Sequence, residues 1–270
     1  MKRILSAVII LCMLLTGCES DQMKAAKESY NTEKTRIEKQ QTELNDLIKE
    51  INAYLDEDPI PLMEEDLTNL QEAVKKAEDE IVEIPPMPDS EKEINDLVDQ
   101  QLKKIDYSKT IEDLQTKKEN LEQSAAKFEL LNAPSQDFII SRLKEVESIK
   151  EIEAVTEDND PNGNLNKAGG YTSQVYFLDS AVDQSKVYGD TLIDKGTDCG
   201  GSVEVYKTVE DAQKRDVYLG AFDNTVFVSG SHIVVGTCVI RTSQYLTASQ
   251  QQDLEQRIID ALTRIDEKKD

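Results

Sequence analysis

Basic charge, aromatic side chains and histidine are all scarce in this chain. Its 270 residues include 31 Lys plus Arg against 54 Asp plus Glu, one His, no Trp and 5% aromatic residues, and the formal net charge is −23. Binding to the phosphate backbone of nucleic acid depends on Lys and Arg, so we expect no nucleic-acid partner. Basic tracts that attract anionic lipid are also missing, so membrane attachment would need another source.

Long hydrophobic runs are limited to the N-terminus. Lys2 and Arg3 precede an apolar run over residues 4–15, which is the arrangement of a secretory signal peptide. As a helix this run spans about 18 Å, well short of the ~30 Å hydrocarbon core, which disfavours a permanent transmembrane anchor. We therefore expect residues 1–17 to be a signal peptide, and their removal would leave a net charge of −25.

The segment Leu15-Thr16-Gly17-Cys18 resembles a bacterial lipobox. The resemblance implies cleavage after Gly17 and a diacylglycerol joined to the Cys18 thiol through a thioether, so that Cys18 becomes the lipidated N-terminus. Two acyl chains on one residue give stable anchoring, which predicts a lipid-anchored protein on the extracytoplasmic face of the cell membrane. The alternative is an ordinary signal peptide with a chance cysteine and a freely secreted product.

Only two cysteines are left for the folded protein, because Cys12 leaves with the signal peptide and Cys18 would carry lipid. Outside the membrane a cysteine pair can stay oxidised, so we predict a disulfide between Cys199 and Cys238. The closed loop of about 40 residues would stabilise this region by roughly 4 kcal/mol. The alternative is two independent small apolar residues, and the separation excludes a CxxC redox pair or a four-ligand zinc site.

Glycine is absent from residues 22–131, where Glu, Lys, Gln, Asp and Leu dominate, as in long helices. A second apolar stripe, from Met63 to Ile84, follows the breaker at residues 58–61. The first stripe is a coiled-coil seam weakened by Glu33 and Gln40, and its apolar residues fall seven apart: Met23, Tyr30, Ile37, Leu44 and Ile51.

A third helix is expected after three prolines, at positions 85, 86 and 88, with residues 89–90 as its cap. Its stripe slips between Ile105 and Ile111, which predicts a kink or break near Tyr107-Ser108. Short turns favour antiparallel neighbours, so residues 18–133 are predicted to form an antiparallel helical bundle or coiled coil that acts as a stalk. The stripes either pack within one monomer or pair copies into a coiled-coil oligomer.

Beyond residue 133 the chain becomes richer in glycine and β-branched residues, which predicts a small α/β sheet-and-helix domain over 134–270 and an α+β fold overall. Helices are expected after the caps Ser135, Thr208 and Thr247. If the third and fourth strands are parallel, the connection between them is expected to be right-handed, and an antiparallel pair is the alternative. Strands are expected at residues 152–156, 172–178, 202–206 and 233–241, the last of them central because both of its faces are apolar.

Several segments between residues 152 and 265 together resemble the C-terminal module of surface lipoproteins of Gram-positive bacteria, which are often labelled extracellular-matrix-binding protein homologues. The resemblance implies a protein of the cell surface, and it brings no catalytic residue, activity or ligand with it. The segments that carry it are residues 156–163, Gly169-Gly170-Tyr171-Thr172, Gly200-Gly201-Ser202 with residues 203–206, residues 210–215, Arg241-Thr242-Ser243 and Leu246-Thr247.

The one candidate metal site is a calcium-loop pattern formed by Asp158, Asp160 and Asn162, followed by Gly163. Oxygen ligands at alternate positions, with a glycine that turns the chain, are what Ca²⁺ requires. However, position 12 of the loop is Gly169 instead of a bidentate acid, and a strand is expected to follow instead of a helix. The favoured alternative is an Asx-rich loop that turns at Pro161 and Gly163. Apart from this candidate calcium ion, no cofactor is expected.

An enzyme would need a nucleophile, a base or a metal cluster. His232 is the single histidine, so a two-His metal site is excluded, and a Ser-His-Asp arrangement would have to use His232 beside Ser231. The paired glycines lack phosphate-loop spacing and are expected in turns. We therefore expect a protein that is not an enzyme, with an envelope hydrolase as a distant alternative.

Two functions fit these features. The leading one is a non-catalytic, lipid-anchored surface protein whose stalk presents a small binding module for adhesion or envelope interaction. The alternative is a structural cell-envelope protein that acts through its coiled-coil helices. The partner is an unknown protein or envelope component, and the acidic surface favours a basic one.

Overall fold

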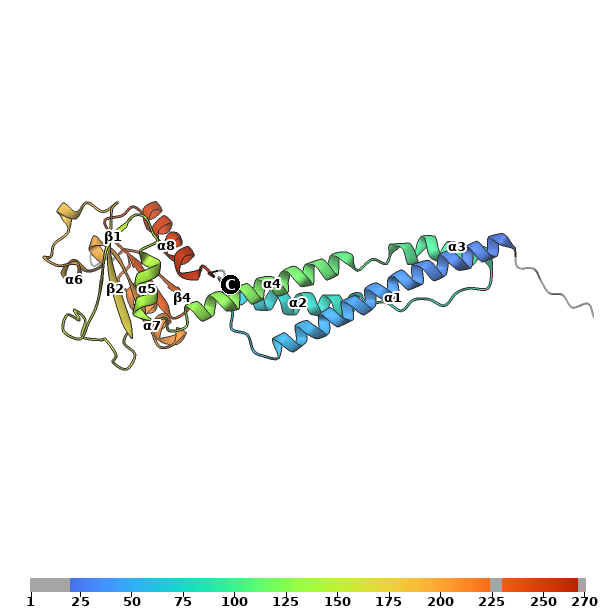
Figure 1. Cartoon of the computed structure of the whole chain (residues 1–270), viewed down its shortest axis with the longest axis horizontal. Coiled ribbons are helices and arrows are strands. Elements are labelled where there is room, and N and C mark those ends of the chain that lie inside the picture. The colour runs from blue at the N-terminus through green and yellow to red at the C-terminus, as the bar shows by residue number, and fades with distance from the viewer. Residues whose placement is uncertain (1–19, 224–229, 267–270) are drawn as a thin grey trace, which may run out of the picture. The chain divides into compact units, whose positions relative to one another are not determined.

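The computed structural model describes residues 20–223 and 230–266 (Figure 1). Helices precede a five-stranded antiparallel sheet, which confirms the α+β class. The described residues divide into two compact units, one of residues 20–53 and 73–115, and one of residues 54–72, 116–223 and 230–266. Cys18 lies outside the described residues, and no described helix is long and apolar enough to cross a bilayer.

The helical part contains the long helices expected from the sequence, and Tyr30, Ile37, Leu44 and Ile51 of the predicted seam are buried. Met23, the first residue of the seam, is only partly buried. The helices are α1 (Asp21–Leu55), α2 (Glu64–Glu80), α3 (Glu91–Gln100) and α4 (Ser108–Leu130), with a 3₁₀ turn, η1 (Leu102–Lys104), between the last two.

Hydrogen bonds within the first unit fix the direction of its segments. The Tyr30 hydroxyl donates to Pro85 O at 2.8 Å, and Gln41 Nε2 donates to Val82 O at 2.7 Å, so residues 82–85 run antiparallel to α1. Arg36 Nη2 donates to Leu102 O at 3.1 Å, and further along α1 Gln40 bonds to residues of the segment that follows, so α3 and the start of α4 run parallel to α1.

The predicted break in the third helix is confirmed, and polar residues of the α1 seam hold it. Asp106 Oδ1 accepts hydrogen bonds from the Ser108 amide at 3.0 Å and from Gln40 Nε2 at 2.8 Å. The bonds from Ser108 and then Gln40 lower the pKa of Asp106 to about 2. Arg36 donates to both Glu33 and Gln40, so the two residues that interrupt the heptad seam tie α1 to this break.

The second helix ends earlier than the apolar stripe predicted. It stops at Glu80 instead of Ile84. A residue before proline avoids the backbone angles of an α-helix, so Pro85 keeps Ile84 from continuing the helix. The Val82 amide instead donates to the buried Tyr107 hydroxyl at 3.1 Å, so the segment that leaves α2 is bonded to the helix break.

The sheet has the strand order β1-β2-β3-β5-β4, with every neighbouring pair antiparallel. The prediction of one strand over 233–241 is wrong, because Gly236 has a φ of +59° and turns the chain into a hairpin in which Val235 pairs with Cys238. β5 is internal, as expected for that run, and β4 is the edge. The strands are β1 (Ile149–Ala154), β2 (Ser173–Asp179), β3 (Gly200–Val205), β4 (His232–Val235) and β5 (Cys238–Thr242).

Gly200 and Gly201 begin β3 and do not form the expected turn. A Cβ on Gly201 would lie 2.4 Å from Phe177 Cζ and 2.2 Å from Arg241 O. Glycine is therefore required because an aromatic ring and a neighbouring strand approach the backbone closely.

Helices cover both faces of the sheet, in the yellow-green to red part of the chain in Figure 1. One face packs against α5 and α8, and the other against α6 and α7. Side chains of Ser135, Thr208 and Thr247 cap their helices as predicted, and Thr247 with Gln250 completes a capping box. The helices are α5 (Gln136–Leu143), α6 (Leu192–Lys195), α7 (Val209–Gly220) and α8 (Ala248–Thr263), with short 3₁₀ turns η2 (Gln184–Lys186) and η3 (Gly196–Cys199).

The end of α4 belongs to the core of the second unit. Leu131 is fully buried against the α5 and α8 face, and its carbonyl accepts bonds from the Thr237 amide at 3.0 Å and the Thr237 hydroxyl at 2.8 Å. Leu62 packs on the same core, and its amide donates to Ser124 O at 3.1 Å. These contacts explain why residues 54–72 and 116–133 group with the sheet.

The disulfide prediction is wrong. Cys199 and Cys238 are both free and buried. Cys238 pairs with Val205 at one end of β3, whereas Cys199 precedes the other end of that strand. Six residues of extended chain span about 20 Å, far beyond the roughly 6 Å between Cα atoms in a disulfide. Burial raises the pKa of the Cys199 thiol to about 11 and that of the Cys238 thiol to about 12.

Candidate functional site

A buried carboxylate lies in the middle of the sheet. Glu204 of β3 has no exposed surface, and strand alternation points it toward the face that α7 covers. Arg215 of α7 donates from Nε to Oε2 at 2.8 Å and from Nη2 to Oε1 at 3.0 Å. Arg241 of β5 donates to Oε1 at 3.1 Å, and the Tyr206 hydroxyl donates to Oε2 at 2.8 Å. Charge-assisted and bidentate bonds of this kind fix geometry strongly.

The charge state of Glu204 follows from two opposing effects. Burial raises its pKa, but the hydrogen bonds and charge of Arg215, then the charge of Arg241, outweigh burial and lower the pKa below the usual 4.5. Burial and the neighbouring carboxylate raise the pKa of Tyr206. At neutral pH the centre is therefore an ionised carboxylate that two guanidinium groups and a neutral phenol surround.

The network extends from the sheet into the loop between β1 and β2. Gln174, directly opposite Glu204 on β2, donates to the Tyr176 hydroxyl at 2.9 Å and to Glu204 Oε1 at 3.4 Å. Asn162 Nδ2 donates to Gln174 Oε1 at 3.4 Å. The loop is thus bonded to the same polar centre as α7.

The predicted calcium ligands take part in loop structure. Asp160 Oδ1 accepts from the Asn162 amide at 3.1 Å, which is an Asx turn, and Oδ2 accepts from the Leu165 amide at 2.8 Å. The Tyr171 hydroxyl also donates to Asp160, while Asp158 is exposed. Across residues 20–223 and 230–266, no group of three or more His, Cys, Asp or Glu side chains is placed to hold a metal ion. Calcium binding stays an untested prediction, and Asp160 already has three donors.

A hollow of about 440 Å³ opens beside this network, between the β1–β2 loop and α7. A Cβ on Gly170 would lie 2.0 Å from Asn164 O, so this glycine lets the loop close on itself at the rim. The Arg215 guanidinium lies 5.4 Å from the centre of the Tyr218 ring in a cation–π contact. The lining side chains converge from the loop, β3 and α7: Asn162, Asn164, Tyr171, Tyr206, Asp211, Lys214, Arg215 and Tyr218, with Gly169 and Gly170.

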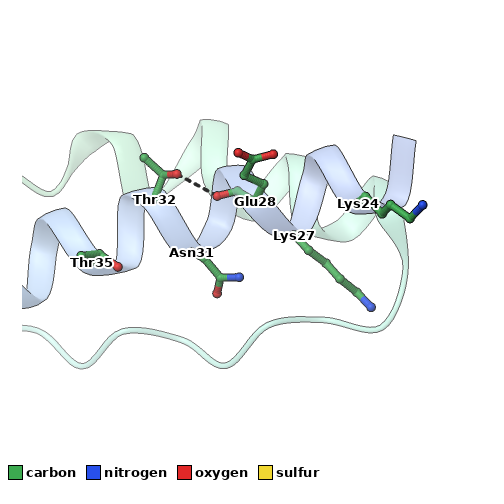
Figure 2. A pocket seen from close by; sticks show the side chains of 6 residues that line it. All are labelled: Lys24, Lys27, Glu28, Asn31, Thr32 and Thr35. Atoms are coloured by element: carbon green, nitrogen blue, oxygen red, sulfur yellow. Dashed lines mark hydrogen bonds between the residues drawn. The ribbon is translucent and has the colours of Figure 1, made fainter. Parts of the chain in front are cut away.

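One other depression lacks this convergence. A shallow depression on α1 is lined by six residues of that single helix, and Figure 2 shows their side chains leaving successive turns in different directions. Within this group the Thr32 hydroxyl donates to Glu28 O at 2.9 Å, an ordinary contact between successive turns of a helix. Of these two depressions, only the hollow is lined by several elements and lies beside a buried charged group. The hollow is therefore the stronger candidate.

His232 begins β4 and is largely buried. Its side chain is 10% exposed, and Nδ1 lies 2.6 Å from Asp216 Oδ1 of α7. Nε2 lies 3.4 Å from Asp223 Oδ2 without a hydrogen bond. Thr242 bonds to the carbonyl of Ser231, and no hydrogen bond from a described serine reaches the ring, so the residues described do not assemble a Ser-His-Asp triad.

Sequence reasoning missed Glu204, Arg215 and Arg241 as a unit. All three lie in segments that carry the family resemblance, but pairing them requires the strand register and the placement of α7. The available signal was an acidic residue inside an otherwise apolar strand, because a buried charge needs a partner.

Comparison of the chain with protein-family models, with curated proteins and with solved structures finds no match.

Proposed function

We propose that this chain is a non-catalytic, lipid-anchored cell-surface protein whose C-terminal sheet domain binds a ligand of the cell envelope or the extracellular matrix. The observation that carries the proposal is the hollow between the β1–β2 loop and α7. Its walls are held by the Glu204 network before any ligand arrives, and preorganised walls reduce the entropy cost of binding.

The chemistry of the hollow supports binding instead of catalysis. Glu204 is saturated with donors from Arg215, Arg241 and Tyr206, so it is poorly placed to take a proton from a substrate. Burial raises the pKa of Tyr171, and so does the hydrogen bond that its hydroxyl donates to Asp160. Burial and the neighbouring Glu204 carboxylate raise the pKa of Tyr206 in the same way. Neither phenol is poised to act as an acid or a base at neutral pH.

The anchoring half of the proposal depends on the lipobox-like segment that ends in Cys18. Its test compares the wild-type chain with Cys18→Ala in cells that process lipoproteins. We expect the wild-type protein in the membrane fraction, with a mass that includes diacylglycerol, and the variant without that mass. A wild-type protein whose mass lacks the diacylglycerol would refute lipidation at this residue.

The binding half is tested with the full chain, purified in detergent and immobilised. Two variants alter exposed side chains of the hollow, Asn164→Ala and Tyr218→Ala, and Tyr188→Ala changes a tyrosine that is 91% exposed and does not line it. We expect the wild type and Tyr188→Ala to retain the same component from envelope or matrix extracts, and the hollow variants to lose it. Retention that is absent, or unchanged in all four proteins, would overturn the binding role of the hollow.

A further inference from the structure

We propose that the hollow binds a polyhydroxylated ligand, a glycan chain, in preference to an anionic, cationic or apolar one. The inference rests on the proposed function, since it names the class of ligand that the same site takes. It follows from four properties of the lining: an exposed aromatic ring, groups that both donate and accept hydrogen bonds, balanced charge, and the absence of aliphatic side chains from the described lining.

The aromatic surface is Tyr218, whose side chain is 56% exposed although its ring is held in place. The Arg215 guanidinium packs over the ring at 5.4 Å, and Phe222 packs edge-on at 5.1 Å between ring centres. A tyrosine fixed by two neighbours loses little entropy when a ligand packs against it. The C–H face of a sugar ring presents apolar surface of about the size of a phenol ring, with hydroxyls around the edge.

Hydrogen-bonding groups surround that ring. Asn162 and Asn164 are exposed at the rim, and an amide both donates and accepts, as sugar hydroxyls do. Arg215 uses Nε and Nη2 to hold Glu204, and its Nη1 makes no hydrogen bond to a described residue. That nitrogen is a fixed donor beside the aromatic ring.

The charges around the hollow are balanced, which disfavours ionic ligands. Arg215 is paired with Glu204, and Lys214 with Glu210 at 2.8 Å. A free anion would therefore meet no surplus of positive charge, and a cation would have to compete with the donors already on these acids. The lining and the groups bonded to it comprise four carboxylates and three cations: Asp160, Glu204, Glu210 and Asp211 against Lys214, Arg215 and Arg241.

Apolar recognition is disfavoured by composition. The ten described residues that line the hollow include no Leu, Ile, Val, Met or Phe, so the hollow offers no hydrophobic pocket for a lipid tail or an apolar side chain. Its volume of about 440 Å³ falls within the range of small-molecule sites. These features together fit a short stretch of sugar units lying against Tyr218.

Isothermal titration calorimetry of the full chain in detergent tests the inference, with chitotetraose, cellotetraose and maltotetraose as probes and inorganic phosphate as the ionic control. We expect at least one tetrasaccharide to bind and phosphate not to bind. Asn164→Ala and Tyr218→Ala should each weaken that binding about tenfold, the loss expected for one hydrogen bond or one ring contact, and Tyr188→Ala should leave it within twofold. Both hollow residues are exposed, so the melting temperatures should match the wild type.

Two outcomes would overturn the glycan class. One is no heat from any tetrasaccharide at 10 mM, and the other is equal affinity in the wild type and both hollow variants. If the extract component is still retained through the hollow in that case, the proposed binding function survives and only the ligand class fails. If retention is also lost in the wild type, the binding function itself fails.

Discussion

Replacing Glu204 by Gln removes the negative charge from a fully buried ion cluster while keeping the size of the side chain. Oε1 accepts bonds from Arg215 and Arg241, and Oε2 accepts bonds from Arg215 and Tyr206, so an NH₂ group at either position would face at least two donors. The Arg215 and Arg241 side chains are only 19% and 11% exposed, so water replaces little of the lost interaction. Removing one partner of a buried pair costs about 3–5 kcal/mol, and we expect a value near 3 kcal/mol because Gln keeps one acceptor.

The loss should depend on pH in a definite direction. The pKa of Glu204 is lower in the folded protein than its usual 4.5, because the guanidinium groups outweigh burial. A carboxyl whose pKa is lower in the folded than in the unfolded protein stabilises the fold fully at pH values above its unfolded-state pKa. This stabilisation is lost as the pH falls through its folded-state pKa. The difference between wild type and Glu204→Gln should therefore be constant from pH 6 to 8 and shrink below about pH 4.5.

Urea unfolding measures both effects. The chain has nine Tyr and no Trp, so near-UV circular dichroism of tyrosine follows tertiary structure while far-UV circular dichroism follows the helices. Glu151→Gln on β1 is the matched control, since Glu151 is exposed and the same substitution there should change stability by less than about 0.5 kcal/mol. If Glu204→Gln unfolds at the same urea concentration as this control, the buried cluster does not hold the sheet domain in the way described.

Three further predictions concern other parts of the chain. Gly201→Ala should destabilise the sheet domain by about 1–3 kcal/mol in urea, because the new methyl group would meet an aromatic ring and a strand carbonyl. Cys199 and Cys238 should resist iodoacetamide at pH 8 until urea is added and then react without reductant, since both are buried thiols with raised pKa values; a requirement for reductant would restore the disulfide. NMR titration should place the Asp106 carboxyl near pH 2, and a value near 4 would contradict its bonds to the helix break.

Local sequence signals predicted much of the helical structure. The three caps, Ser135, Thr208 and Thr247, each need only a side-chain oxygen and a backbone amide three residues later, so the information lies in a short segment. The break near Tyr107 was likewise visible as a slip of the apolar period. The sequence did not show that the two polar residues of the α1 seam are linked to that break. Gln40 bonds to it directly, and Glu33 is linked to it through Arg36.

Long-range pairing set the limit on prediction for the sheet and the site. The run from 233 to 241 is apolar throughout, so periodicity could not place the turn at Gly236, and antiparallel register then separated Cys199 from Cys238. The same register brings Glu204 within reach of Arg241 from another strand. The hollow depends on these strand pairings. The sequence contains its residues, but it could not predict that they lie together in one site.

The cluster around Glu204 is better explained by positioning than by stability, and one variant separates the two. A buried ion pair replaced by apolar residues of similar size is often neutral or stabilising, because desolvation no longer has to be offset. Glu204→Leu combined with Arg215→Met and Arg241→Met should therefore fold with at least the stability of Glu204→Gln. Because Arg215 both holds Glu204 and supports the Tyr218 ring at the hollow, the triple variant should also lose the glycan binding that we propose for the hollow. A triple variant that is stable and still binds with wild-type affinity would show that the cluster does not organise the hollow.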